Sequence, residues 1–379
     1  MRRAAACLAV LLAAAGCGGG AKTAPRPDLQ KTLNALVTGK MRVAPGAVAY
    51  VSGPKGTWIG TAGMAEVKSH TPMAADTRSR LGSVSKLWTA VVVAKLAEEK
   101  KLKLSDTVER WLPGFFPYGK RITIFQLLHH TSGMIDDNDF SARPEYWLAK
   151  IHDPKLKQQI LALAAKLQED PSTTVSSQFE MRIAAALPLL FDPGTAYHYT
   201  NVGYKTLGVI AEKAGGASLD TLYHRIIIDP LRLKSVGYDP TATVTGDHAT
   251  PYIVEKNGKL QDATHLDIGN LASSGGVVSD VRDEATFLTA LVRGKILGPA
   301  MLKKLETSGP GYYGFGIGVE PLCGDTVYNH GGATSATMAE VGVNGDGSRV
   351  VVLLLNGRTW NSWGDDAPVQ AMQSLYCAS

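Results

Sequence analysis

Ser83-Val84-Ser85-Lys86 places a serine three residues before a lysine, and the rest of the chain can be interpreted outward from this stretch. The apolar, helix-forming residues 87–97 follow it, so the pattern predicts a helix that begins near Ser83. Residues three apart on a helix lie on one face, one turn apart, so the Lys86 amine can reach the Ser83 hydroxyl. A serine becomes a nucleophile when a base takes its proton, and a lysine whose pKa is lowered by burial can be that base.

The four residues alone leave two interpretations open. An N-cap serine followed by a solvated lysine fits them as well as a catalytic pair does, because short motifs also occur by chance. A second copy, Ser52-Gly53-Pro54-Lys55, serves as a control. Its Gly-Pro pair predicts a turn, which we expect to be the tip of a hairpin between strands at residues 46–51 and 57–62.

Two later segments add residues that carry chemistry. Tyr199-Thr200-Asn201 follows a Pro-Gly turn and precedes an apolar helical pattern, and Asn329-His330-Gly331-Gly332-Ala333 ends a predicted strand. A phenol can move protons, an amide can hold a lysine or a carbonyl, and glycines permit close approach of a backbone or ligand. Taken singly, the tyrosine could be a half-buried loop aromatic and the histidine a satisfied strand residue.

Together and in this order, the three motifs resemble the serine penicillin-recognising family, which comprises class C β-lactamases, D-alanyl-D-alanine carboxypeptidases and their esterase relatives. A sister form of the signature reads Ser-x-x-Lys, Ser-Asp-Asn and Lys-Thr-Gly. This chain resembles the branch with Tyr-x-Asn second and His-x-Gly third. Further family-like phrases surround them, among them Arg80-Leu81-Gly82-Ser83 and Ser274-Gly275-Gly276-Val277.

The resemblance implies a role for each matching residue. Ser83 would be the acylated nucleophile, Lys86 its base, and Tyr199 the residue that passes a proton to the leaving group. Asn201 would orient the lysine and the substrate, His330 stands where the β-lactamases have lysine, and Gly332 matches the strand glycine. The backbone N–H groups of Ser83 and Ala333 would form the oxyanion hole, where two fixed donors stabilise a tetrahedral intermediate.

The chain departs from the family at the third motif. Gly331 stands where the family often has threonine, and Ala333 has no hydroxyl either. Those hydroxyls commonly help to hold a substrate carboxylate. The acylation residues are therefore complete, while the means of carboxylate recognition are reduced.

The N-terminus predicts export. Arg2 and Arg3 precede a short apolar run, and small residues lead to Cys17, which resembles a bacterial lipobox. We expect residues 1–16 to be a signal peptide and residues 17–27 a lipidated tether, which would hold the protein at the outer face of the bacterial cell membrane or in the cell envelope. The alternative is an ordinary signal peptide cleaved nearby.

The cysteines outside the leader, the metal-binding motifs that are missing and the net charge exclude several classes of function. Cys323 and Cys377 could pair in an exported protein, and the sequence leaves that pairing open. No Cys-x-x-Cys or His-Glu-x-x-His occurs, so we expect no metal and no cofactor. The net charge of +5 and the lack of basic runs with interleaved aromatics indicate no nucleic-acid partner.

The order of predicted elements indicates two lobes in residues 28–379. Helices are expected at 28–38 and 366–377, and later strands at 314–320, 326–330, 338–343 and 349–355. Strands at both ends with helices between them predict an α/β lobe, in which an antiparallel sheet built from both termini is flanked by helices. An all-α lobe of about residues 90–270 would be inserted in it, and the resemblance implies the same β-lactamase/transpeptidase-like fold. Within that lobe, residues 136–190 form a long, charged helical stretch without a functional explanation.

The first expectation for function is an exported serine hydrolase that acts like a D-alanyl-D-alanine carboxypeptidase on cell-wall-type peptides, with peptidoglycan as a potential partner. An esterase of the same fold comes second and a class C-type β-lactamase third. A slowly turning over penicillin-binding sensor lipoprotein is a different class of function. No Gly-x-Ser-x-Gly elbow occurs, which disfavours an α/β-hydrolase.

Overall fold

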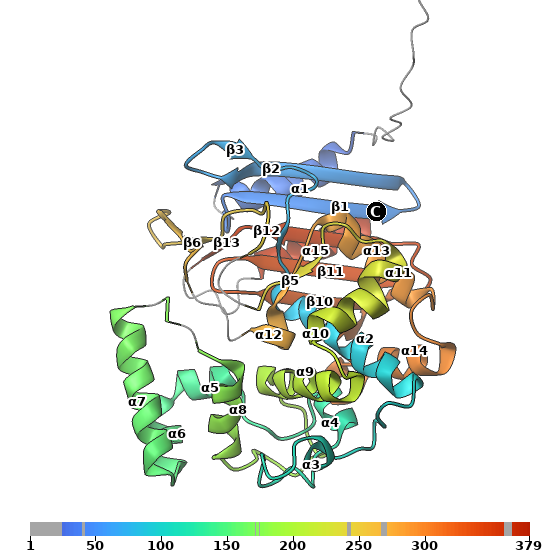
Figure 1. Cartoon of the computed structure of the whole chain (residues 1–379). Helices are drawn as coiled ribbons and strands as arrows, with labels where there is room; N and C mark the ends of the chain where they lie inside the picture. The colour runs from blue at the N-terminus through green and yellow to red at the C-terminus, as the bar shows by residue number, and fades with distance from the viewer. Residues whose placement is uncertain are drawn as a thin grey trace, which may run out of the picture.

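The computed structural model describes residues 25–39, 42–170, 172–173, 175–240, 244–266, 271–359 and 366–379. Its centre is an antiparallel sheet of seven strands with the order β3-β2-β1-β12-β11-β10-β9 (Figure 1). The strands are β1 (Gly46–Gly53), β2 (Gly56–Glu66), β3 (Thr71–Pro72), β9 (Gly318–Leu322), β10 (Asp325–Ala333), β11 (Met338–Asn344) and β12 (Val350–Leu355).

The sheet joins the two ends of the chain, as the sequence predicts. Strand β1 pairs with β12 in antiparallel register, with Ala47 opposite Leu355. The hairpin of β1 and β2 turns at Pro54 and Lys55, so Ser52-Gly53-Pro54-Lys55 is a hairpin tip. The expected fold class, an α/β lobe with a sheet from both termini and inserted helices, is confirmed.

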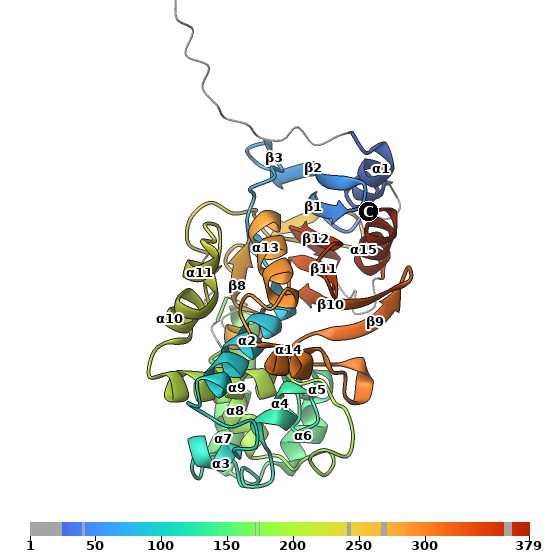
Figure 2. The ribbon, with the colours of Figure 1, turned by 90° about the vertical axis from the view of Figure 1, so that its right-hand side faces the viewer.

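Helices cover both faces of this sheet (Figure 2). Helices α1 (Pro27–Val37) and α15 (Ala367–Ala378) lie on one face, and α2 (Ser85–Glu98) and α13 (Val281–Val292) lie on the other. Strand β12 shows why, because alternate residues of a strand point to opposite faces. Val351 and Leu353 belong to the core under α1 and α15, while Val352 and Leu354 belong to the core around α2.

The inserted region is mainly helical, and two small sheets join short strands of this region to strands before and after it. Its helices include α3 (Val108–Trp111), α4 (Ile124–Leu128), α5 (Asp137–Ala142), α6 (Pro144–Lys150), α7 (Pro154–Glu169), α8 (Ser177–Ala185), α9 (Asn201–Gly215), α10 (Leu219–Tyr223), α11 (Asp229–Leu231) and α12 (Ala272–Gly275), and α14 (Pro299–Glu306) follows α13. In one small sheet, β8 (Val277–Ser279) pairs with β4 (Ser79–Arg80) and β5 (Gly237–Tyr238). In the other, β6 (Tyr252–Val254) pairs with β7 (Leu260–Asp262) and β13 (Gly357–Thr359).

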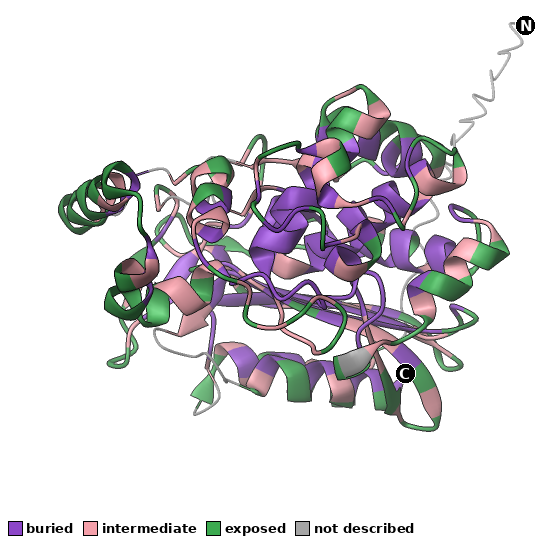
Figure 3. Cartoon of the chain, turned by 90° about the horizontal axis from the view of Figure 1, so that it is seen from below, coloured by how far each residue is buried: buried purple, intermediate pink, exposed green. Residues whose placement is uncertain are grey.

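The described part of residues 136–190 folds as four separate helices instead of one long helical stretch. Pro144 and Pro154 stand in the first turns of α6 and α7, where a proline starts a helix because it lacks the N–H that a helix interior needs. Figure 3 shows α7 projecting from the body with most of its surface exposed.

A second difference lies before β9, which begins at Gly318 and not at residue 314. Gly316 has φ +72°, and a Cβ there would lie 2.6 Å from the Lys86 carbonyl oxygen. The chain therefore bends against α2 at this point, and an extended strand cannot form until the bend is complete.

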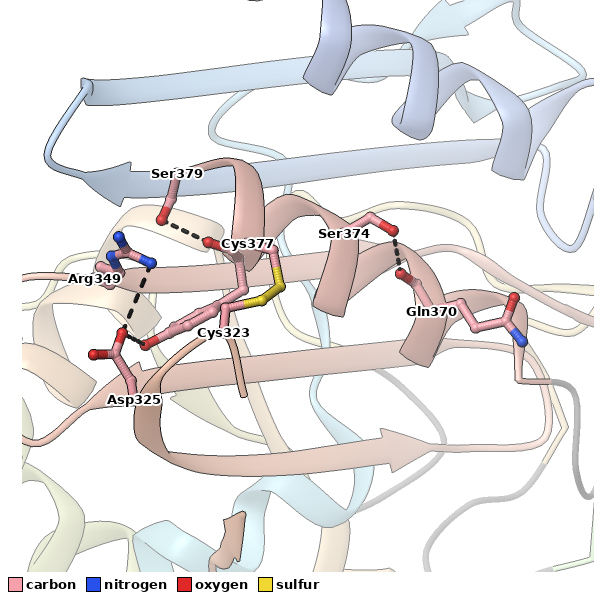
Figure 4. Close-up of a disulfide and its surroundings, with 8 residues drawn as sticks. Cys323, Asp325, Arg349, Gln370, Ser374, Cys377 and Ser379 are labelled. Atoms are coloured by element: carbon pink, nitrogen blue, oxygen red, sulfur yellow. Dashed lines mark hydrogen bonds and ion pairs between the residues drawn. A yellow bond between two sulfur atoms is a disulfide. The ribbon is translucent and has the colours of Figure 1, made fainter. Parts of the chain in front are cut away.

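Cys323 and Cys377 form a disulfide between residues 54 positions apart (Figure 4). It ties the turn between β9 and β10 to the end of α15, beside a hydrogen bond of 2.8 Å from Tyr376 Oη to Asp325 Oδ2. The predicted leader, the lipidation residue Cys17 and most of the tether lie outside the described residues. Within the described ranges, no helix is long and apolar enough to cross a membrane, and no cluster of His, Cys, Asp and Glu side chains could hold a metal ion.

Candidate active site

Ser83 stands on a one-turn 3₁₀ helix, Gly82–Val84, that leads directly into α2. Gly82 has φ +52°, and a Cβ on it would lie 2.6 Å from the Ala333 nitrogen. Only glycine fits this backbone and this contact, so the Leu81-Gly82-Ser83 turn is pressed against the end of β10. Helix α2 behind it is buried on nearly all sides, which makes it a rigid base for the serine.

Lys86 lies below Ser83 and has no exposed surface. Its Nζ atom lies 2.9 Å from Ser83 Oγ, 2.7 Å from Asn201 Oδ1 and 2.9 Å from the carbonyl oxygen of Ser274. Burial lowers the pKa of Lys86 to about 7, although the nearby Asp136 and Asp137 carboxyl groups act in the opposite direction. A substantial fraction of the amine is therefore neutral near neutral pH, with a lone pair that can accept the Ser83 proton.

The Asn201 amide is oriented by two acidic residues at the start of α5. Its Nδ2 donates to Asp137 Oδ1 at 2.9 Å, and its backbone N–H donates to Asp136 Oδ1 at 2.5 Å. Because the amide nitrogen is used in this way, the Oδ1 atom must face the Lys86 amine.

A buried cation balances the acids. Lys205 Nζ lies 2.6 Å from Asp137 Oδ2 and also contacts Glu180 Oε2. Burial opposes ionisation of Asp137, but the Lys205 charge and the Asn201 hydrogen bond outweigh it and lower the pKa of Asp137 to about 2. Burial and repulsion from Asp137 raise the pKa of Asp136 to about 7.

Tyr199 closes the other side of the serine. Thr200 caps α9 by accepting a hydrogen bond from the Gly203 N–H, so Tyr199 and Asn201 stand on either side of a helix start. The Tyr199 side chain lines the same cleft as Ser83, and its ring centroid lies 4.8 Å from Lys86 Nζ. Burial raises the pKa of Tyr199 well above its ordinary value, which keeps the phenol protonated.

His330 is neutral in this site. Its Nδ1 lies 2.5 Å from the Gly331 carbonyl oxygen, which can only accept, so Nδ1 carries the proton. Its Nε2 lies 2.8 Å from Tyr313 Oη and therefore accepts from that phenol. Burial, together with the nearby Lys86, lowers the pKa of His330 to about 3. The third motif thus presents no cation where the β-lactamases have lysine.

The end of β10 passes close to the serine turn. A Cβ on Gly332 would lie 2.0 Å from the Leu81 carbonyl oxygen and 3.0 Å from the Ser83 nitrogen, so a side chain is excluded there. This contact, and that of Gly82 with Ala333, bring the Ser83 and Ala333 amides to one edge of the cleft. The structure therefore gathers all seven residues predicted for the site around one serine: Ser83, Lys86, Tyr199, Asn201, His330, Gly332 and Ala333.

The cleft around Ser83 has a volume of about 490 Å³. Its described lining includes four acidic residues, Asp137, Glu180, Glu340 and Asp366, and one basic residue, Arg358. A second pocket of about 380 Å³ adjoins it and shares Asp137, Ser141 and Glu180 with it. That pocket is lined mainly by apolar side chains of α5, α7 and α8, so residues 136–190 build a wall of the cleft and a neighbouring apolar cavity.

Several residues around the serine were not predicted from the sequence: Asp136, Asp137, Glu180, Lys205, Tyr313 and Glu340. The run Asp136-Asp137-Asn138-Asp139 is a visible signal, because it gathers three carboxyl groups and an amide in four residues. The spacing of Asn201 and Lys205 on one helical face is another. Glu340 gives no signal, because only the register of two strands places it in the cleft.

Comparisons with known proteins show which family the chain belongs to. The sequence profile of the family described as Beta-lactamase matches residues 33–374. The chain is 27% identical over 221 residues to the probable hydrolase clz13 of Cochliobolus lunatus, covering 49% of this chain and 36% of the relative. It is 29% identical over 181 residues to the esterase EstB of Burkholderia gladioli, and this match covers 46% of this chain and 42% of the relative.

Several solved structures resemble the chain over nearly its whole length. One of them is a D-stereospecific amidohydrolase from Streptomyces sp., with a TM-score of 0.76 and 27% identity, and the match covers 94% of this chain and 100% of that chain. Other relatives bear the names of penicillin-binding proteins, D-amino acid amidases and a putative D-alanyl-D-alanine carboxypeptidase. The chain spans only 36% and 40% of the lengths of the first two curated relatives. The match over residues 33–374 nevertheless shows the family: the chain belongs to the beta-lactamase family of serine hydrolases.

Proposed function

We propose that the chain is a serine hydrolase that forms an acyl-enzyme on Ser83 and acts on esters and amides whose leaving groups carry no carboxylate. The observation that carries the proposal is the Lys86 amine, fully buried and 2.9 Å from Ser83 Oγ. Neutral Lys86 would take the Ser83 proton while Oγ attacks the carbonyl carbon. The N–H groups of Ser83 and Ala333 would hold the resulting oxyanion.

The Tyr199 phenol would then give its proton to the leaving group and regain one from the Lys86 ammonium. The protonated leaving group departs, and the acyl group stays on Ser83. Water would attack the acyl-enzyme by the same route in reverse and restore Ser83. The position of Tyr199 supports this assignment, because its ring lies 4.8 Å from Lys86 Nζ and lines the same cleft as Ser83.

Three features favour substrates without a carboxylate. His330 is neutral, Gly331 and Ala333 offer no hydroxyl, and the described lining of the cleft has more acidic than basic residues. A substrate carboxylate would therefore find few hydrogen-bond donors at this end of the cleft. The adjoining apolar pocket gives room for an apolar substituent.

The second candidate is the D-alanyl-D-alanine carboxypeptidase activity that the sequence led us to expect. Arg358, whose Nη1 donates to the Thr334 carbonyl oxygen at 2.9 Å, is the one basic residue among the described lining residues and could hold a peptide carboxylate. The relatives named for D-amino acid substrates add weight to this candidate.

A substrate panel separates the candidates. An aryl ester, an amino-acid amide, a D-alanyl-D-alanine peptide and a cephalosporin would be compared by turnover and by intact mass of the acyl-enzyme. We expect measurable ester and amide turnover, modest peptidase activity and poor cephalosporin hydrolysis. Efficient cephalosporin turnover contradicts the proposal. If Arg358→Gln lowers the ratio of peptide to ester turnover, the second candidate gains a binding residue.

Export with a lipid at Cys17 remains a proposal from the leader sequence, and membrane attachment would then make the cell envelope the place of action. The disulfide of Cys323 and Cys377 supports export, because disulfides persist in oxidising compartments. Cys17→Ala should release the protein from the membrane fraction. A soluble wild-type protein whose N-terminus lies downstream of Cys17 and is unmodified contradicts the proposal.

A further inference from the structure

Glu340 is a buried carboxyl group at the edge of the cleft that the proposed acylation does not use. It lies on β11, its exposed fraction is 5%, and it belongs to the lining of the cleft that contains Ser83. No hydrogen bond or ion pair joins its carboxyl to another residue in the described part of the chain. Buried carboxyl groups normally have such partners, so an unpaired one in a cleft indicates a ligand that supplies the missing donor.

The register of the sheet explains its position. Gly331 on β10 stands directly opposite Glu340 on β11, so the two residues share one face of the sheet. A Cβ on Gly331 would lie 2.9 Å from Glu340 Oε2 and 3.0 Å from Oε1. The carboxyl group therefore fills the place that a side chain at position 331 would take, where the family often carries a hydroxyl.

The next residue faces the nucleophile. A Cβ on Gly332 would lie 3.0 Å from the Ser83 nitrogen, so consecutive positions of β10 border the Ser83 amide and the Glu340 carboxyl. Consecutive strand residues point to opposite faces, but Ser83 and Glu340 line the same cleft of about 490 Å³, so a substrate that spans the edge of β10 can reach both.

We propose that Glu340 is a specificity-determining residue that binds an ammonium group of the substrate at the position left open by Gly331. This inference rests on the proposed function, because it selects amino-acid amides and esters with a free amine from the wider class of carboxylate-free substrates. An ammonium group would donate to the carboxyl oxygens and stabilise the ionised form of Glu340, whereas a substrate carboxylate in the same place would oppose that ionisation.

The other ionisable groups of the described lining are already engaged or exposed. Asp137 and Glu180 are paired with Lys205, Arg358 donates to the Thr334 carbonyl oxygen, and Asp366 is exposed before α15. Burial raises the pKa of Glu340 to about 8. An ammonium beside it favours the ionised form, so binding near pH 7 should release a proton from this carboxyl.

The test measures binding without turnover. In the full-length Ser83→Ala variant, calorimetry would compare phenylalaninamide, which has a free amine, with N-acetylphenylalaninamide, which has none. We expect the free amine to bind about tenfold or more tightly, since a charge-assisted hydrogen bond contributes at least that factor. Adding Glu340→Gln should remove this preference. It should also remove the proton release on binding, which is measured by repeating the calorimetry in buffers of different ionisation enthalpy. Glu145→Gln, a surface change on α6, serves as the matched control and should leave both unchanged.

Gly331→Ala covers the case in which Glu340→Gln fails to fold, because the new Cβ would displace the carboxyl and should also remove the preference. Equal affinity for the two ligands in the protein with Glu340 intact overturns the inference, as does a preference that survives both variants. Labelling of Ser83 in the wild-type protein by a fluorophosphonate is a separate readout. If Ser83 takes no label but the preference for the free amine still depends on Glu340, the proposed function is refuted while the amine-binding site is supported.

Discussion

The Nζ atom of Lys86 lies 2.9 Å from the Oγ atom of Ser83, and the lysine side chain has no exposed surface. Both facts matter for the chemistry. The distance allows direct proton transfer, and the burial lowers the pKa of the amine to about 7. The same lysine in solvent would remain an ammonium and could not act as a base.

Lys86→Arg should lower the rate of Ser83 acylation by about 10²–10⁴-fold, because arginine cannot give up its proton at working pH. Stopped-flow acylation with an aryl ester measures the effect. Lys95→Arg, the same change on the half-exposed part of α2, is the matched control and should keep the wild-type rate. Near-wild-type acylation in Lys86→Arg would remove lysine from the mechanism.

The pH profile of kcat/KM should rise through about pH 7 and then level off, because the active form is the deprotonated amine and the pKa of Lys86 is about 7. The pKa of Asp136 is also about 7, so the apparent value belongs to the two groups together. Asp136→Asn removes a carboxyl that favours the ammonium form and should move the limb about one pH unit or more downward. Asp247→Asn, a change at an exposed position, is the control and should leave the acidic limb of the profile in place. If the limb does not move in Asp136→Asn, the titrations of Lys86 and Asp136 are not coupled.

Gly331→Thr tests why carboxylates are poor ligands. The added hydroxyl should raise kcat/KM for a carboxylate-bearing substrate relative to a neutral ester about tenfold, the worth of one charge-assisted hydrogen bond. The new Cβ would lie 2.9 Å from Glu340 Oε2, so the carboxyl must also turn away. Gly331→Val has the same shape without the hydroxyl and separates the two effects. An equal gain in both variants means that displacing Glu340 is enough.

Cys377→Ser should lower the free energy of unfolding by about 4 kcal/mol, the chain-entropy value for a loop closed between residues 54 positions apart. Denaturant unfolding of the mature protein, with and without reductant, measures this change. Two titratable thiols from Cys323 and Cys377 in the unreduced, denatured wild-type protein would rule the bond out.

Local signals in the sequence predict much of the fold. The strands of both termini alternate or run apolar, the turns carry Gly and Pro, and α1 has its apolar stripe, so six of the seven strands of the sheet follow from patterns of a few residues. The two-residue edge strand β3 was not predicted. The break of residues 136–190 into four helices was missed, although Pro144 and Pro154 mark two of its helix starts. The apolar periodicity on either side of these prolines is helical, so the sequence favoured a continuous helical stretch over separate helices.

The active-site contacts also divide into those that local sequence predicts and those that tertiary packing creates. Ser83 and Lys86 are neighbours on one turn, so their contact is visible in the sequence. The acids that orient Asn201 come from 65 residues earlier in the chain, and Glu340 reaches the cleft through pairing of β10 with β11. Such partners are set by tertiary packing, and no local pattern encodes them.

Covalent labelling of Ser83 tests the central claim most directly. The wild-type protein would be treated with a fluorophosphonate, weighed as an intact protein and then digested for peptide mapping. The account predicts a single adduct on Ser83, absent from Ser83→Ala although that variant keeps its fold by circular dichroism. A label on Ser85 or Ser52, or a folded wild-type protein that takes no label, would contradict it.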